Sequence, residues 1–133
     1  MDPSQVNYLA ALIAALSSFL IGGVWYSPIL FARAWMREAG LKEEELRRGV
    51  GKAFAGAFVM SVIAAINLAF FLGPNATVTW GATAGALAGV GWVATSLTTV
   101  FLFERRSVML ILIDAGYLAV AYTVMGAIIG AWP

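Results

Sequence analysis

The chain has 133 residues, of which 62% are hydrophobic and 11% charged, and its mean hydropathy is +0.88. A soluble domain of this length could not bury so much apolar surface, so the composition indicates a membrane protein. Because the chain has no cysteine, no histidine and a net charge of only +1, disulfide frameworks, thiolate chemistry and histidine-based catalysis are excluded. We therefore expect no enzymatic activity, no metal, no cofactor and no nucleic acid partner.

Four apolar runs follow one another along the chain. Each is near the roughly 20 residues that a helix needs to cross about 30 Å of hydrocarbon. They cover residues 6–30, 53–72, 78–103 and 108–132. The segment before the first run contains no basic residue, so we interpret that run as a retained helix and not as a cleaved signal peptide. The predicted fold class is all-α: one domain forming an integral membrane bundle of four transmembrane helices.

The basic residues predict how the bundle is oriented, because cytoplasmic loops are enriched in Lys and Arg. All eight lie between the first and second runs or between the third and fourth: Arg33, Arg37, Lys42, Arg47, Arg48, Lys52, Arg105 and Arg106. Both termini should therefore face the periplasm or exterior, with the protein in the inner (plasma) membrane of the cell. In the first cytoplasmic loop, residues 41–48 are predicted to form a short polar helix that ends at Gly49.

Small residues recur at four-residue spacing in the predicted helices, a pattern that lets helices pack closely in lipid. The candidate packing residues are Ala57 and Ser61 in the second run, Gly81, Gly85 and Gly89 in the third, and Gly126 and Gly130 in the fourth. The four helices carry more faces of small residues than the contacts within one bundle need. Besides the lipid bilayer, we expect a second copy of the chain or another membrane subunit as a partner.

Asp114 is the only ionisable residue inside an apolar run. A charge at that depth costs roughly 2.5–3.5 kcal/mol on insertion scales, so an acid there is a candidate functional site. Three states are open: a neutral acid that donates a hydrogen bond, a carboxylate paired with Arg105 or Arg106, or a ligand for Na⁺ or another cation. The same acid could instead be structural and fix the packing of the helices.

Other polar side chains are expected at the same depth as Asp114. Asp114 lies eight residues from Arg106, as Trp25 does from Arg33 and Ser96 does from Glu104, so all three are about 12 Å inside the cytoplasmic face. The predicted shell around Asp114 consists of Trp25, Tyr26, Ser27, Ser96 and Tyr117. Pro28 is predicted to kink the first helix and free a carbonyl near Val24 for a cation or water, or else to mark the end of that span.

Four segments in order along the chain resemble a family of small bacterial and fungal membrane proteins, domain of unknown function 1761. They are WYSPxxFxxxW from Trp25, FExRS from Phe103, IDAGY from Ile113 and MGAIIG from Met125. The resemblance implies a similar length and four-helix hydropathy, and it implies no particular activity.

The leading hypothesis is an oligomeric membrane protein that passes or exchanges an ion or small solute, with Asp114 binding a cation or proton. The main alternative is a structural or accessory subunit that packs within a larger membrane complex.

Overall fold

The computed structural model describes residues 2–133, and all regular structure in this part of the chain is helical. Four segments are long and apolar enough to cross a membrane: α1 (Tyr8–Trp25), α4 (Val50–Leu72), the stretch Val78–Phe103, and α7 (Val108–Ala131). The third of these comprises α5 (Val78–Ala88), a π-helical segment η2 (Gly89–Ala94) and α6 (Thr95–Phe103). The predicted all-helical fold with four candidate membrane helices is confirmed.

Side-chain caps fix where three of these helices begin. Asn7, Thr77 and Ser107 each accept a hydrogen bond from the backbone N–H three residues later, at 3.1 Å. Such a cap satisfies an N–H group that has no partner within the helix. A short 3₁₀ turn, η1 (Pro3–Gln5), precedes α1.

The first membrane helix is shorter than the predicted run, because α1 ends at Trp25 and not at residue 30. Pro28 lies in the turn that follows and kinks no helix. The carbonyl of Val24 is not free either: it accepts hydrogen bonds from the backbone N–H of Ser27 at 3.1 Å and from its hydroxyl at 2.6 Å. The predicted kink with an open carbonyl was therefore wrong, and the alternative, that the span ends here, holds.

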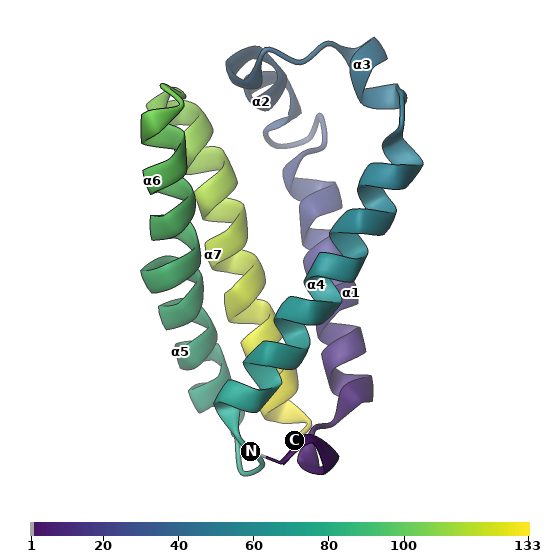
Figure 1. The fold of residues 1–133 in the computed structure, drawn as a ribbon, viewed down its shortest axis with the longest axis vertical. Helices are drawn as coiled ribbons and strands as arrows, with labels where there is room; N and C mark the ends of the chain where they lie inside the picture. The colour runs from purple at the N-terminus through teal and green to yellow at the C-terminus, as the bar shows by residue number, and fades with distance from the viewer. Residues whose placement is uncertain (1) are drawn as a thin grey trace.

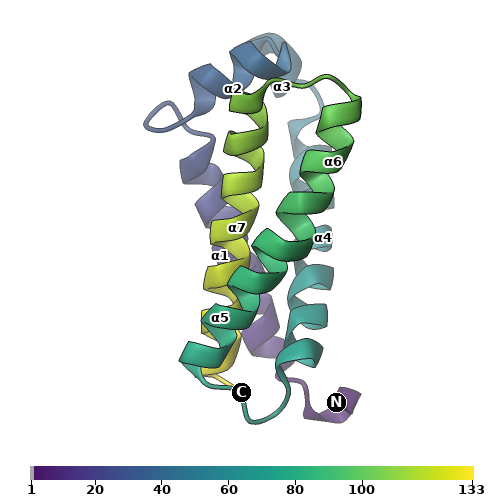
Figure 2. The same cartoon turned by 90° about the vertical axis from the view of Figure 1, so that its left-hand side faces the viewer.

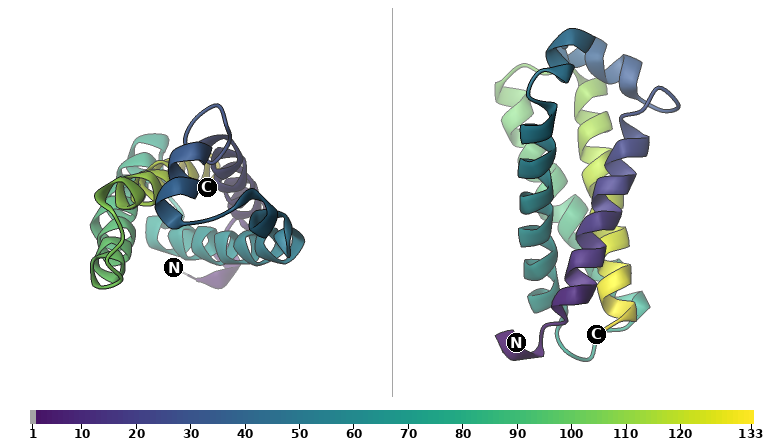
Figure 3. Two further views of the ribbon diagram at one scale, coloured as in Figure 1. Left: turned by 90° about the horizontal axis from the view of Figure 1, so that it is seen from above. Right: turned by 90° about the vertical axis from the view of Figure 1, so that its right-hand side faces the viewer.

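The connection between α1 and α4 contains two short helices that lie across one end of the bundle, α2 (Ala32–Ala39) and α3 (Glu43–Arg47) (Figure 1). Gly40 ends α2 in the left-handed conformation, with φ of 70°. Both termini lie at the opposite end of the bundle (Figure 3). They are joined there by a hydrogen bond of 3.1 Å from the Asn7 amide to the Trp132 carbonyl.

The closest helix pairing is that of α5 with α7, and in Figure 2 α5 crosses in front of the lower part of α7. A Cβ atom added at Gly81 would collide with the backbone of Gly126, and one added at Gly130 would collide with the backbone of Thr77. A Cβ atom at Gly85 meets the Tyr122 backbone in the same way, and one at Gly89 would lie 2.8 Å from the Tyr122 Cβ. The predicted packing glycines of the third and fourth runs thus form one interface.

The second membrane helix, α4, packs over only part of its length. Its buried residues, Ala65, Leu68, Ala69 and Leu72, all lie in the half near the termini. Towards the end where α2 and α3 lie, α4 leans away from α6 (Figure 1) and stays beside α1, where Phe54 and Phe58 meet the ring of Phe19 edge to face. Ala57 is exposed and Ser61 is partly so, and the Ser61 hydroxyl bonds the Ala57 carbonyl of its own helix at 2.9 Å.

Replacing Gly81 by Ala should destabilise the bundle, because the new methyl group would meet the Gly126 backbone, which has no flexible side chain to move aside. Overpacking of this kind costs about 1–3 kcal/mol. Gly56→Ala is the matched control, since nothing lies within 4 Å of its added Cβ. The measurement is loss of helical circular dichroism during denaturant titration in detergent micelles. Equal midpoints for the two variants would contradict the packing described above.

Candidate functional site

The site centres on a hydrogen bond between the end of α1 and the first half of α7. The Tyr26 hydroxyl donates to Oδ1 of Asp114 at 2.6 Å. Tyr26 is the C-cap residue that follows α1, and Asp114 lies six residues beyond the start of α7, about 9 Å along that helix. Bonds of this length between a hydroxyl and a carboxylate are among the stronger hydrogen bonds in proteins.

A second bond at almost the same height joins the same two helices. The indole N–H of Trp25 donates to the carbonyl of Ile113 at 2.8 Å. Gly116 makes room for the indole, since a Cβ atom there would lie 3.1 Å from Cζ2 of Trp25. Because Trp25 and Tyr26 are adjacent, as are Ile113 and Asp114, the two bonds together fix both the height and the rotation of Asp114 relative to α1.

Tyr117, one turn beyond Asp114, continues the row of polar groups towards the membrane centre. Its hydroxyl donates to the Ser18 carbonyl at 3.0 Å and lies 3.1 Å from the Ser18 hydroxyl. Because Tyr117 donates its one hydroxyl proton to the Ser18 carbonyl, the Ser18 hydroxyl acts as donor to the Tyr117 oxygen. The rings of Tyr26 and Tyr117 meet edge to face at 5.6 Å. Asp114, Tyr26, Tyr117 and Ser18 thus form a row of two hydrogen-bonded pairs that meet through the two tyrosine rings, called the tyrosine row below.

Aromatic side chains from the α1–α2 connection cover the outer end of this row. Trp35 of α2 packs on Tyr26 with ring centroids 4.7 Å apart, and Phe31 packs on Trp25 at 5.0 Å. Since α2 also contacts α7, it holds the ring of Tyr26 in place from the loop side.

Asp114 has no ionic partner within the described residues 2–133. The ion pairs there are Arg47 with Glu43 at 2.9 Å and Arg106 with Glu104 at 3.2 Å. The pairing of Asp114 with Arg105 or Arg106, one of the three states considered above, is therefore not seen. Asp114 is only partly buried, and its second oxygen, Oδ2, forms no hydrogen bond to any described residue. That oxygen is the group to which a proton or a cation can bind.

Two residues of the predicted shell do not join Asp114. The Ser27 hydroxyl bonds the Val24 carbonyl within its own turn, and Ser96 is exposed on α6. Counting residues from the cytoplasmic end gives a side chain's height but not its direction, so Ser96 shares the depth of Asp114 on another face. Trp25, Tyr26 and Tyr117 do lie around Asp114 as predicted. Sequence reasoning missed Ser18 and Gly116, although Ser18 lies two helical turns before Trp25 and Tyr26 on α1.

The donor set around Asp114 decides which ligands suit it. It offers one carboxylate and neutral oxygens, and Asp114 is the only acidic residue in the four membrane-spanning segments. Sites for Ca²⁺ or Mg²⁺ generally combine several oxygen ligands with more negative charge. The set therefore suits a proton or a monovalent cation.

These features together define a small protein with four candidate membrane helices and a polar row between its first and last helices. Residues 9–130 match the family model described as "Protein of unknown function (DUF1761)". The chain therefore belongs to this family, as the four sequence segments predicted. No curated protein and no solved structure matches the chain.

Proposed function

We propose that this protein is a membrane transporter or channel that binds a proton or a monovalent cation at Asp114 and moves it, or a small solute coupled to it, across the bilayer. The observation that supports the proposal is the free Oδ2 of a partly exposed carboxyl group inside a membrane-spanning helix. Acidic groups at that depth are costly and generally serve transport pathways or proton relays. A transport role needs no catalytic nucleophile or base, in keeping with the absence of His and Cys.

The proposed mechanism uses the two oxygens of Asp114 differently. Oδ1 is held by the Tyr26 hydroxyl, so the carboxyl group keeps a fixed direction in its different states. Oδ2 carries the proton in the neutral form and contacts the cation in the ionised form. Ligand arrives from the end of the bundle where α4 leans away from α6, and the tyrosine row continues from Asp114 towards the membrane centre.

We further propose that the end carrying α2 and α3 is cytoplasmic and that the protein lies in the inner or plasma membrane. Seven of the eight basic residues belong to the two connections at that end, the eighth, Lys52, lies in the first turn of α4 beside them, and none lies near the termini. Asp114 would then load from the cytoplasm, being about 9 Å from that end of α7.

In vesicles reconstituted with the purified protein, Asp114→Ala should abolish the flux of protons or Na⁺, and Asp114→Asn should alter its dependence on pH or Na⁺. Tyr26→Phe should lower the flux about tenfold, because the carboxyl loses its orienting donor, worth about 1.5 kcal/mol. Ser96→Ala is the matched control and should keep the wild-type flux, since Ser96 is exposed on α6.

Equal flux through the wild type and all three variants of Asp114 and Tyr26 would remove Asp114 from the pathway. No flux through any of them, together with copurification of another membrane protein, would favour the second candidate function, that of an accessory subunit. One observation supports this alternative: the exposed half of α4 carries small residues, among them Gly56 and Ala57, that contact no other part of the protomer closely. A second copy of the chain could occupy the same face.

The proposed orientation can be tested with single cysteines, because the chain has none of its own. Asn75→Cys, in the connection between α4 and α5, should react with a membrane-impermeant maleimide added to intact cells. Glu45→Cys, on exposed α3, should react only after the membrane is permeabilised. The reverse pattern of labelling would overturn the orientation.

A further inference from the structure

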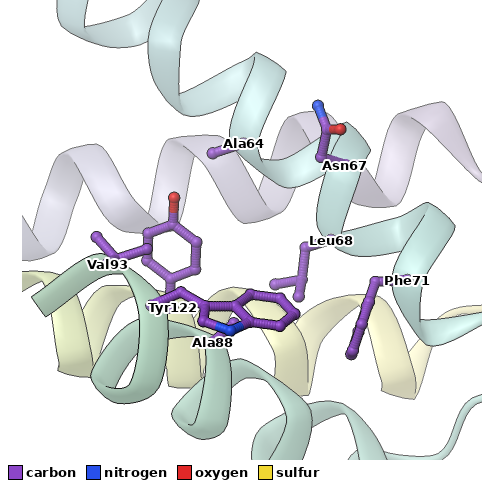
Figure 4. Close-up of a pocket in the computed structure, with 8 residues that line it drawn as sticks. Ala64, Asn67, Leu68, Phe71, Ala88, Val93 and Tyr122 are labelled. Atoms are coloured by element: carbon purple, nitrogen blue, oxygen red, sulfur yellow. The ribbon is translucent and has the colours of Figure 1, made fainter. Parts of the chain in front are cut away.

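A cavity separate from the Asp114 site lies between α4, the π-helical segment η2 and α7 (Figure 4). Its volume is about 360 Å³, within the range of roughly 300–1,000 Å³ that is usual for small-molecule sites. Leu68 and Phe71 of α4, Trp92 of η2 and Tyr122 of α7 supply most of its apolar wall. Because the cavity is partly open and these helices are candidate membrane helices, it faces the hydrocarbon.

The π-helical segment shapes one wall of this cavity. An extra residue per turn widens the helix from Gly89 to Ala94 and places Trp92 and Val93 at the cavity. The Thr95 hydroxyl donates to the Gly91 carbonyl at 2.7 Å and lies 3.2 Å from the Trp92 carbonyl, so the irregular turn is satisfied within the helix. Trp92 meets Phe71 of α4 edge to face at 5.6 Å, although 63% of its surface remains exposed. Single π turns of this kind are frequent at functional sites.

The Tyr122 hydroxyl at the cavity has hydrogen-bonding capacity that the protein leaves unused. No described residue accepts a hydrogen bond from it, and it points from α7 towards α4 in Figure 4. The Asn67 amide donates to the Ile63 carbonyl of its own helix at 2.9 Å and points away from the Tyr122 hydroxyl in Figure 4. In hydrocarbon a free hydroxyl needs a partner, because lipid chains offer none.

We propose that this cavity binds an uncharged single-chain lipid that carries a hydroxyl head group. The hydroxyl of the lipid accepts the proton of Tyr122, while the chain lies against Leu68, Phe71 and Trp92. No Lys, Arg, Asp or Glu lines the cavity, so nothing there would compensate the charge of a phosphate or ammonium head group. The volume also suits one chain better than the two of a phospholipid. This site is independent of Asp114 and of transport.

The test uses the full-length protein in phosphatidylcholine vesicles that contain a small fraction of a hexadecanol with a photoactivatable diazirine in its chain. Mass spectrometry then locates the cross-linked residues, with unlabelled hexadecanol as competitor. The expected result is saturable labelling of residues in η2 and in the 64–71 part of α4.

Three variants test the assignment to the cavity. Ala64→Phe fills it and should abolish the saturable labelling, whereas Ala57→Phe, on the same helix but outside the cavity, should leave the labelling unchanged. Tyr122→Phe should raise the concentration of hexadecanol needed for half-competition about 3- to 10-fold, the usual effect of one lost hydrogen bond, and should not change competition by hexadecane.

Labelling that does not saturate, or that Ala64→Phe and Ala57→Phe affect equally, would overturn the proposal and identify the label as bulk lipid. Stronger labelling by a phosphatidylcholine with the diazirine in its chain would also overturn the proposal, because it would assign the cavity to phospholipid. Cross-links between two protein chains through α4 and η2 would assign it to a second copy and also contradict the proposal.

Discussion

The close backbone contact of α5 with α7 is the constraint on which the rest of the bundle depends. In lipid no hydrophobic force brings helices together, so close packing and hydrogen bonds between helices must hold them. Gly81, Gly85, Gly126 and Gly130 permit this contact because any side chain there would strike the facing backbone. Once α7 is fixed against α5, it forms the surface that α1, α2, α4 and α6 also contact.

The polar site follows from the way α1 is attached to α7. In place of glycine packing along its whole length, α1 is joined to α7 by three hydrogen-bonding side chains. Trp25 and Tyr26 come from the end of α1, and Tyr117 comes from α7. These bonds satisfy polar groups within the membrane and at the same time direct the carboxyl of Asp114 into the bundle. The same residues therefore stabilise the fold and form the site. The second oxygen of Asp114, which is only partly buried, forms no hydrogen bond to any described residue.

Hydropathy predicted the four helices, and the spacing of small residues predicted which positions allow close packing, since both depend on repeating local patterns. Which helices pair through these positions was not predicted. Height in the membrane was also predictable, because an α helix rises by a constant 1.5 Å per residue, and it placed Trp25, Tyr26 and Tyr117 correctly near Asp114. The direction in which a side chain points around its helix was not predictable, so Ser96 was assigned to the wrong face. The end of α1 at Trp25 and the π turn at η2 come with local hydrogen bonds of Ser27 and Thr95, which a hydropathy profile does not report.

The central claim, that Asp114 binds a proton or a cation inside the membrane, is tested most directly by infrared difference spectroscopy of the reconstituted protein. Spectra are compared between two pH values and between low and high Na⁺. The other six acidic residues lie outside the membrane-spanning segments and are common to the wild type and Asp114→Asn. The account predicts a carboxyl band that responds to protons or Na⁺ in the wild type and is absent from Asp114→Asn. Identical difference spectra for the two proteins would contradict it.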